Sequence, residues 1–300
     1  KDRRLVCSKF PARLELALPH TGSIPPELGN LAALEVLDLA RNELTGESRG
    51  PNCNFYSSDF CRKSGHESRL RVGGTGFTDF KYLEKKRAGW FISISSANVY
   101  ISSAGAIPAQ LGALNTLTWL DLSRNELSGP IPPEMGKLAV LKRLEVQHNQ
   151  LAGPIPPELG KPTALEELHI WDNQLSGPIP PQLGQLGALK TLLLTHNKLE
   201  GPIPPELGKL AALKALKLQF NYLTELIPKE LGALSQLRTL VFSKNRLTGP
   251  IPPELGELRE LRELRLSYNQ LIGHIPPQLG QLGALKTLSL SHNKLEGELN

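Results

Sequence analysis

A regular alternation of leucines and polar residues runs through most of this chain. In the segment Leu120-Asp121-Leu122 the apolar positions are two residues apart, which predicts a short strand with one buried face. An asparagine follows at Asn125, where we expect the chain to turn. From there the same frame recurs every 24 residues to the end of the chain. A fixed period within about 20–50 residues predicts a solenoid, in which each unit buries its apolar face against its neighbours.

Each repeat carries an asparagine at the same place in the frame. Its amide has two donor hydrogens and an acceptor oxygen, so it can bond to the backbone of its own coil and of the next one. Removing one such amide would leave buried backbone groups unpaired, at a cost of about 1–3 kcal/mol. We therefore expect a buried ladder made of Asn125, Asn149, Asn173, Asn197, Asn221, Asn245, Asn269 and Asn293.

The segment between two strands is rich in glycine and proline. Gly129, four residues after Asn125, permits a positive φ angle or a close backbone approach. The run Ile131-Pro132-Pro133 excludes a regular helix at that point. Extended and 3₁₀ segments should therefore form the back of each coil. The predicted fold is an α/β-class, right-handed solenoid with a parallel concave β-sheet and a convex side of 3₁₀ and extended segments.

The frame Leu-x-x-Leu-x-Leu-x-x-Asn-x-Leu-x-Gly-x-Ile-Pro resembles the plant-type leucine-rich repeat, densely over residues 106–300 and loosely over 11–46. The wording Pro-Pro-Glu-Leu-Gly looks most like algal or other stramenopile versions. Such repeats occur in receptor-kinase ectodomains, in secreted inhibitors and in ROCO-type GTPases. The resemblance implies non-catalytic binding of a protein or peptide on the curved face. Three departures, Glu225-Leu226, Pro162 and His274, should each disturb one turn at the back without breaking the coil.

The chain divides into three parts. Residues 1–46 hold a cap-like segment and two repeats, residues 47–105 are an insert, and residues 106–300 hold eight repeats of 24 residues. The last repeat is cut short, so we expect further chain in the natural protein. Removal of residues 47–105 restores the 24-residue register without remainder.

Three interpretations of the insert stay open. It resembles the folded island that interrupts plant steroid-hormone receptors, with a helix expected around Asp79–Arg87 and strands at Phe91–Ile94 and Val99–Ile101. It can equally be a surface loop, because loop-closure entropy grows slowly with length. Finally, the clean excision and the donor-like codons available to Gly46-Glu47-Ser48 favour a retained intron. A spliced transcript lacking this segment would exclude the island.

Composition narrows the classes of partner. The insert holds 9 of the 34 basic residues and 5 of the 29 acidic ones, and so contributes most of the net charge of +5. The basic balance therefore gives no reason to expect nucleic-acid binding by the repeats. The sequence holds no apolar run of the roughly 20 residues that span a membrane. As a fragment, the chain should be monomeric.

Cysteine usage bears on the compartment. Secreted arrays of the plant type carry a cysteine pair in each cap, whereas this chain has only Cys7, Cys53 and Cys61. It also lacks any Asn-x-Ser/Thr acceptor for glycosylation. Both features favour a cytoplasmic setting over an extracellular one. In an oxidising setting, Cys53 and Cys61 could instead close a small loop.

The outward positions of the strands are the candidate binding residues, because adjacent coils place them side by side. Exposed aromatic rings are frequent binding hot spots, and a row of positive charges suits an anionic partner. The competing interpretation is a solvated face that binds nothing. The predicted contact residues are Trp119, His169, Trp171, Lys190, Lys214, Lys217, Phe220, Arg238, Arg262, Arg265 and Tyr268.

The frame offers no catalytic constellation. His148, His196 and His292 share one row but stand two or more coils apart, which is too far for a shared metal ion. Asp121 and Glu145 are neighbouring carboxylates on a face that we expect to be open, where nothing shifts their pKa values. We therefore expect no enzyme activity, no cofactor and no metal. The leading hypothesis is a binding module, and the alternatives are the recognition region of a larger kinase or GTPase and a secreted inhibitor.

Overall fold

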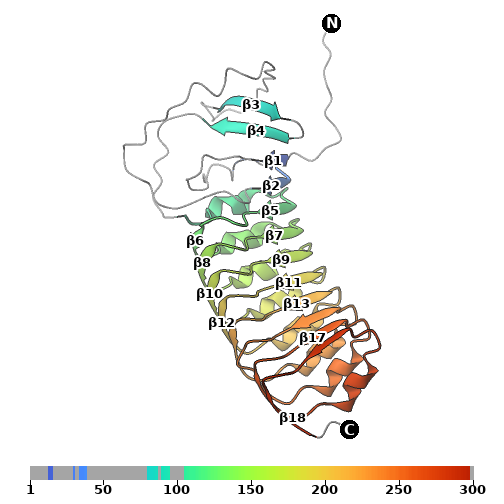
Figure 1. The fold of residues 1–300 in the computed structure, drawn as a ribbon. Helices are drawn as coiled ribbons and strands as arrows, with labels where there is room; N and C mark the ends of the chain where they lie inside the picture. Colours follow the sequence, from blue (N-terminus) through green and yellow to red (C-terminus); the bar gives the residue numbers. More distant parts are fainter. Residues whose placement is uncertain are drawn as a thin grey trace.

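The computed structural model describes residues 13–15, 30, 34–38, 80–86, 89–94 and 105–297. From residue 105 to 297 the chain winds as a curved solenoid, with strands along one side and short 3₁₀ turns along the other (Figure 1). Together with two earlier strands these coils form one parallel sheet of ten strands. In order, the strands are β1 (Arg13–Glu15), β2 (Val36–Asp38), β5 (Trp119–Asp121), β7 (Arg143–Glu145), β9 (Glu167–His169), β11 (Thr191–Leu193), β13 (Ala215–Lys217), β15 (Thr239–Val241), β17 (Glu263–Arg265) and β19 (Thr287–Ser289).

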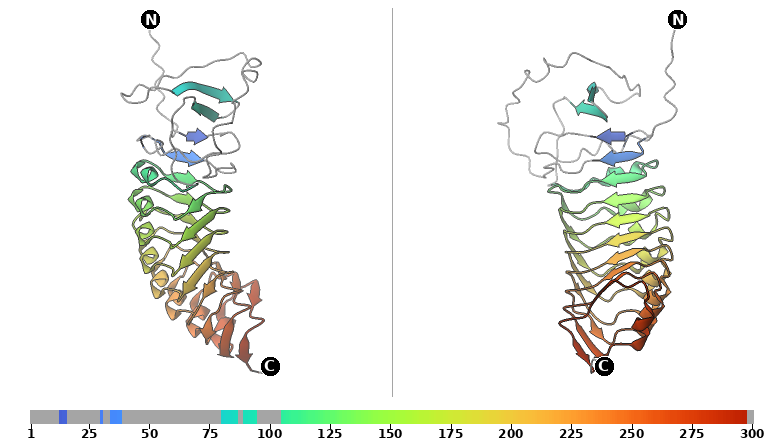
Figure 2. Two further views of the ribbon diagram at one scale, coloured as in Figure 1. Left: turned by 90° about the vertical axis from the view of Figure 1, so that its left-hand side faces the viewer. Right: turned by 45° about the vertical axis from the view of Figure 1, so that its right-hand side comes forward.

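The 3₁₀ turns lie on the outer side of the curve (Figure 2), as the proline pattern predicts. In most coils an extended proline precedes the turn and a second proline opens it, so its fixed φ angle starts the turn. No α-helix occurs among residues 105–297. The turns are η3 (Ala109–Ala113), η4 (Pro133–Lys137), η5 (Pro157–Gly160), η6 (Pro181–Gln185), η7 (Pro205–Lys209), η8 (Lys229–Ala233), η9 (Pro253–Glu257) and η10 (Pro277–Gln281).

A second set of short parallel strands follows the asparagine turns along the flank of the solenoid. It is divided into a sheet of five strands and a sheet of three. The break falls at Glu225, one of the three departures from the frame, where a non-glycine residue adopts φ 64°. The strands are β6 (Ser128–Gly129), β8 (Gln150–Gly153), β10 (Gln174–Gly177), β12 (Lys198–Gly201) and β14 (Tyr222–Leu223), then β16 (Thr248–Gly249), β18 (Gln270–His274) and β20 (Lys294–Glu296).

The other two departures are equally local. The turn η5, which precedes Pro162, is one residue shorter than the other turns. His274 ends β18, the longest strand of the flank, and its Nδ1 lies 3.3 Å from the carbonyl oxygen of Glu296. Since the ten-stranded sheet continues past all three positions, the prediction that they leave the coil unbroken is confirmed. The prediction of a disturbed turn at the back holds only at Pro162, because Glu225 and His274 alter the flank strands and the turns η8 and η10 keep five residues.

The core is a row of leucines, one slice per coil. Leu120, Leu144 and Leu168 face one another in register across β5, β7 and β9, and each is at most 1% exposed. Each slice gains its apolar walls from the coils before and after it. In the last described coil the equivalent Leu288 is 47% exposed, because only one neighbouring coil covers it.

The asparagine ladder is confirmed, with one correction to its direction. Asn221 accepts a hydrogen bond from the amide of Leu199 and donates to the carbonyl of Leu194, both in the preceding coil and not in the next one. It also donates to the carbonyl of Leu218 in its own coil. The same arrangement recurs from Asn149 to Asn293. Five rungs are buried, whereas Asn149, Asn173 and Asn293 are half-buried.

The two described strands of the segment that interrupts the repeats are not part of the main sheet. β2 pairs directly with β5, and Leu37 lies opposite Leu120. Within the insert, β3 (Phe80–Lys86) and β4 (Gly89–Ile94) form an antiparallel hairpin, and β4 lies beside β1. The helix expected around Asp79–Arg87 is therefore wrong, because residues 80–86 form a strand whose backbone pairs with β4. The strand expected at Phe91–Ile94 is confirmed, while Val99–Ile101 and the three cysteines lie outside the described residues.

In the part of the chain that the structure describes, no helix has the length and apolar character needed to cross a membrane.

Candidate binding face of the sheet

The concave face presents rows of side chains, because the strands pair in register. The row four residues before each ladder asparagine begins with Asp121, Glu145 and His169, which lie directly opposite one another on successive strands. It continues through Leu193, Lys217, Val241, Arg265 and Ser289. Asp121 and Val241 are only 8% and 5% exposed, so the face is less open than the sequence pattern predicts. Its charge changes from acidic to basic along the solenoid.

A second row consists of the residues immediately before the ladder asparagines. Every one of them adopts a left-handed backbone with φ between 52° and 57°. This conformation is uncommon for residues other than glycine, and here it repeats because each strand ends in the same tight bend. Since the bend is the same in every coil, the side chains stack on one another along the solenoid. The row is Arg124, His148, Asp172, His196, Phe220, Lys244, Tyr268 and His292.

Five consecutive members of this row form what we call the aromatic stack: His196, Phe220, Lys244, Tyr268 and His292. The rings of His196 and Phe220 stack with centroids 3.9 Å apart, and those of Tyr268 and His292 do the same. Between the pairs, the ammonium group of Lys244 lies 4.5 Å from the Phe220 ring and 5.4 Å from the Tyr268 ring. Phe220 is 38% and Tyr268 46% exposed, so rigid apolar surface is offered to solvent.

The predicted row of positive charges is present beside the strands, and two of its members are already paired. Lys190 lies 2.5 Å from a carboxylate oxygen of Glu166, and Arg238 lies 3.9 Å from Glu260. The hydrogen bond from Lys190 lowers the pKa of Glu166 below its ordinary value. Lys214, Arg262 and Lys286 are exposed. Arg265, in the neighbouring row, pairs with Glu263 at 2.6 Å.

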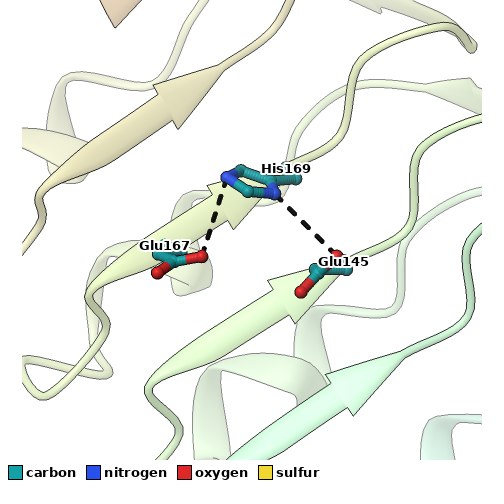
Figure 3. A group of neighbouring side chains, drawn as sticks. All are labelled: Glu145, Glu167 and His169. Atoms are coloured by element: carbon teal, nitrogen blue, oxygen red, sulfur yellow. Dashed lines mark ion pairs between the residues drawn. The ribbon is translucent and has the colours of Figure 1, made fainter. Parts of the chain in front are cut away.

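A compact polar cluster occupies the face at β7 and β9 (Figure 3). The two ring nitrogens of His169 lie 4.0 Å from carboxylate oxygens of Glu145 and Glu167, one on each side. The second oxygen of Glu167 pairs with Arg143 at 3.0 Å, and Arg143 also lies over the Trp119 ring. Burial lowers the pKa of His169, against the opposing effect of the two carboxylates. The ring is therefore neutral near pH 7.

The structure brings some of the predicted contact residues together and separates others. Phe220 and Tyr268 are joined by Lys244, which sequence reasoning missed, as it missed the flanking rings of His196 and His292. Trp171 lies apart and packs edge-on against His148, with centroids 4.2 Å apart. The signal for the stack was available in the sequence, because its members are spaced by 24 residues immediately before each asparagine.

Comparison with known families agrees with this architecture. The family model "Leucine Rich Repeat" matches residues 116–138, 140–162, 164–186 and 188–210, and a second model, "Leucine rich repeat", matches residues 211–271. Together they cover about half of the chain. No curated protein is significantly similar to the chain in sequence.

Several solved structures share the fold. The ectodomain of the Arabidopsis receptor kinase HAESA, in complex with an extended IDA peptide hormone, is 29% identical with a TM-score of 0.69, covering 93% of this chain and 37% of that one. The ectodomain of GASSHO1/SCHENGEN3 from Arabidopsis thaliana, in complex with CASPARIAN STRIP INTEGRITY FACTOR 2, is 34% identical with a TM-score of 0.62, covering 93% and 32%. A plant ice-binding protein is 26% identical with a TM-score of 0.64, covering 96% and 73%. The chain thus spans about a third of the length of both receptor ectodomains.

Proposed function

Because this chain belongs to the leucine-rich repeat proteins of the plant type, we propose that it is a non-catalytic module that binds an extended peptide on its concave sheet. The site we propose is the aromatic stack together with the exposed basic residues beside it. The observation that carries the proposal is the pair of exposed rings, Phe220 and Tyr268, held 38% and 46% exposed in a fixed stack.

The stack has the properties of a binding hot spot. Aromatic rings bury a large area with few rotatable bonds, and stacking on His196 and His292 reduces the mobility of Phe220 and Tyr268 further. Preorganised side chains lose little entropy on binding. A partner that binds this apolar surface therefore causes little loss of side-chain conformational entropy.

The surroundings of the stack favour an acidic partner. Lys244 lies within the stack, while Lys214, Arg262 and Lys286 are exposed on the same half of the solenoid. Long-range attraction by such a group of cations raises the association rate of an anionic peptide. The opposite half of the face, with Asp121 and Glu145, would disfavour the same peptide. We therefore expect the peptide to bind in one preferred direction along the sheet.

Similarity to receptor ectodomains solved with peptides supports this proposal. It also favours a second candidate, in which the chain is the recognition region of a receptor kinase whose catalytic domain lies outside it. A kinase domain downstream in the full-length gene would support this second candidate. A GTPase domain there would support the ROCO-type alternative, and an upstream secretory leader would support the inhibitor alternative.

The test is a selection of displayed random linear peptides on the immobilised chain, followed by affinity measurements on the variant F220A/Y268A. Truncation of a hot-spot aromatic costs about 2 kcal/mol or more. Selected peptides should be enriched in acidic residues and should lose at least about tenfold in affinity for the double variant.

A matched control is Tyr222→Ala, which removes a ring that is 45% exposed but lies at the start of β14 on the flank. It should leave peptide affinity unchanged. Peptides that bind F220A/Y268A as well as they bind the unaltered chain would contradict the proposal. So would an equal loss caused by Tyr222→Ala.

A further inference from the structure

The polar cluster at β7 and β9 contains the donor atoms of a metal site. Glu145 and His169 are direct neighbours across two paired strands, and Glu167 lies two residues before His169, on the same face. One ligand-type atom from each of these three side chains lies within 4.8 Å of the other two. In a tetrahedral zinc site the ligand atoms are about 3.3 Å apart, since each is about 2.0–2.2 Å from the ion. Because Glu145 and Glu167 lie beside different ring nitrogens of His169, ion binding requires the side chains to turn toward one of these nitrogens.

The cluster is partly enclosed by the sheet. The side chains of Glu145, Glu167 and His169 are 17%, 25% and 18% exposed, so an ion could enter and keep a water ligand. Partial burial also makes unbalanced charge costly. Within this cluster, Arg143 pairs with Glu167, one of the two carboxylates.

Two buried polar atoms at this place have no hydrogen-bond partner. One is Nε2 of His169, and the other is the side-chain amide oxygen Oε1 of Gln147. Gln147 is 9% exposed, and its amide nitrogen lies 3.3 Å from a carboxylate oxygen of Glu145. This hydrogen bond holds the Glu145 carboxylate in the cluster. A metal ion bound at Nε2 would give this unpartnered ring nitrogen of His169 a partner.

We propose that Glu145, Glu167 and His169 bind a divalent transition-metal ion, for which zinc is the best match. A neutral imidazole with two carboxylates is a donor set that zinc accepts, whereas calcium prefers six to eight oxygen ligands. This proposal departs from the sequence-based expectation of no metal, which rested on the spacing of His148, His196 and His292 and on the open position of Asp121 and Glu145.

Zinc binding to the chelator-treated full chain, measured by isothermal titration calorimetry near neutral pH, tests the proposal. We expect one zinc ion per chain, and a loss of affinity of at least about tenfold in His169→Gln and in Glu145→Gln. Cobalt should give the visible absorption of a low-coordinate site in the unaltered chain but not in these variants. Circular dichroism verifies that each variant is folded. Because Glu145→Gln keeps the size of the side chain, a loss of zinc affinity in this variant reflects the missing carboxylate and not a change of packing.

The matched control is His196→Gln, which removes an exposed histidine from the same sheet face in the next coil. It should bind zinc as the unaltered chain does. Absence of zinc binding would overturn the proposal. Equal affinity in His169→Gln would overturn it too, since this would show an adventitious ion only, and so would a preference for calcium over zinc. None of these measurements depends on the proposed peptide binding.

Discussion

At the scale of single residues, the coil depends on one amide and one unusual backbone conformation. The ladder asparagine satisfies groups of two coils at once, and Asn221 does so with an amide only 4% exposed. The residue before it adopts the left-handed region in every described coil from Arg124 to His292. Glu225 adopts the same region at a position where Gly201 and Gly249 stand in neighbouring coils. The backbone of Glu225 is therefore strained, and a glycine at this position would remove the strain.

Replacing Glu225 by glycine should stabilise the protein. A left-handed conformation costs a residue with a side chain roughly 1–2 kcal/mol, whereas glycine adopts it freely. Glycine also makes the unfolded chain more flexible, which offsets part of the gain. We expect a net increase in the free energy of unfolding of about 0.5–1 kcal/mol, measured by urea denaturation.

The control is Glu200→Gly, at an exposed position of β12 that does not have a positive φ angle. This substitution should lower the free energy of unfolding by about 0.5–1 kcal/mol, because glycine makes the unfolded chain more flexible and relieves no backbone strain here. If both variants were destabilised alike, strain at Glu225 would be refuted.

At the scale of elements, the 3₁₀ turns stack so closely that their glycines have no space for a side chain. A Cβ atom at Gly184 would lie 2.4 Å from the carbonyl oxygen of Glu206 in the next turn. Such a separation forces the backbone to move, so the recurring Leu-Gly pair of the frame is required by packing. At Gly280, in the last turn, a Cβ atom would meet nothing within 4 Å.

The substitution Gly184→Ala should therefore destabilise the chain by about 1–3 kcal/mol, as overpacking does. Gly280→Ala should be neutral or stabilising by up to about 1 kcal/mol, because alanine restricts the unfolded chain. Neither glycine has a positive φ angle, so the two variants differ mainly in whether a neighbouring coil lies against the added methyl group. Equal midpoints of thermal unfolding for the two variants would show that the turns are not in close contact.

At the scale of the whole molecule, the solenoid carries two different surfaces on one concave face. Glu145, Glu167 and His169 form the polar cluster near its amino-terminal part, and the aromatic stack begins in the next coil, at His196. Both arise from one geometric fact, which is that residues spaced by 24 become lateral neighbours. A sheet of this kind can therefore present separate sites without any change of fold.

The same fact explains what could be predicted from the sequence. The strand positions, the 3₁₀ turns and the asparagine ladder follow from the period alone, because each is set by residues within one repeat. The stack around Lys244 and the cluster around His169 depend on side chains from different coils. The sequence predicts which residues share a row on the sheet. The distances between their side chains and the burial of these side chains depend on the geometry of the coils and could not be predicted. The hairpin of β3 and β4 lies outside the period, and there local pattern predicted a helix incorrectly.

The central claim is that each coil is held to the preceding one by its asparagine, and amide hydrogen exchange tests it most directly. The amide of Leu199 donates to Asn221, one coil ahead. In Asn221→Ala, exchange should accelerate most at Leu199, whereas Leu247, which donates to the intact Asn269, should stay protected. Rapid exchange at Leu199 in the unaltered chain, or the same protection in the variant, would contradict the stacked-coil account.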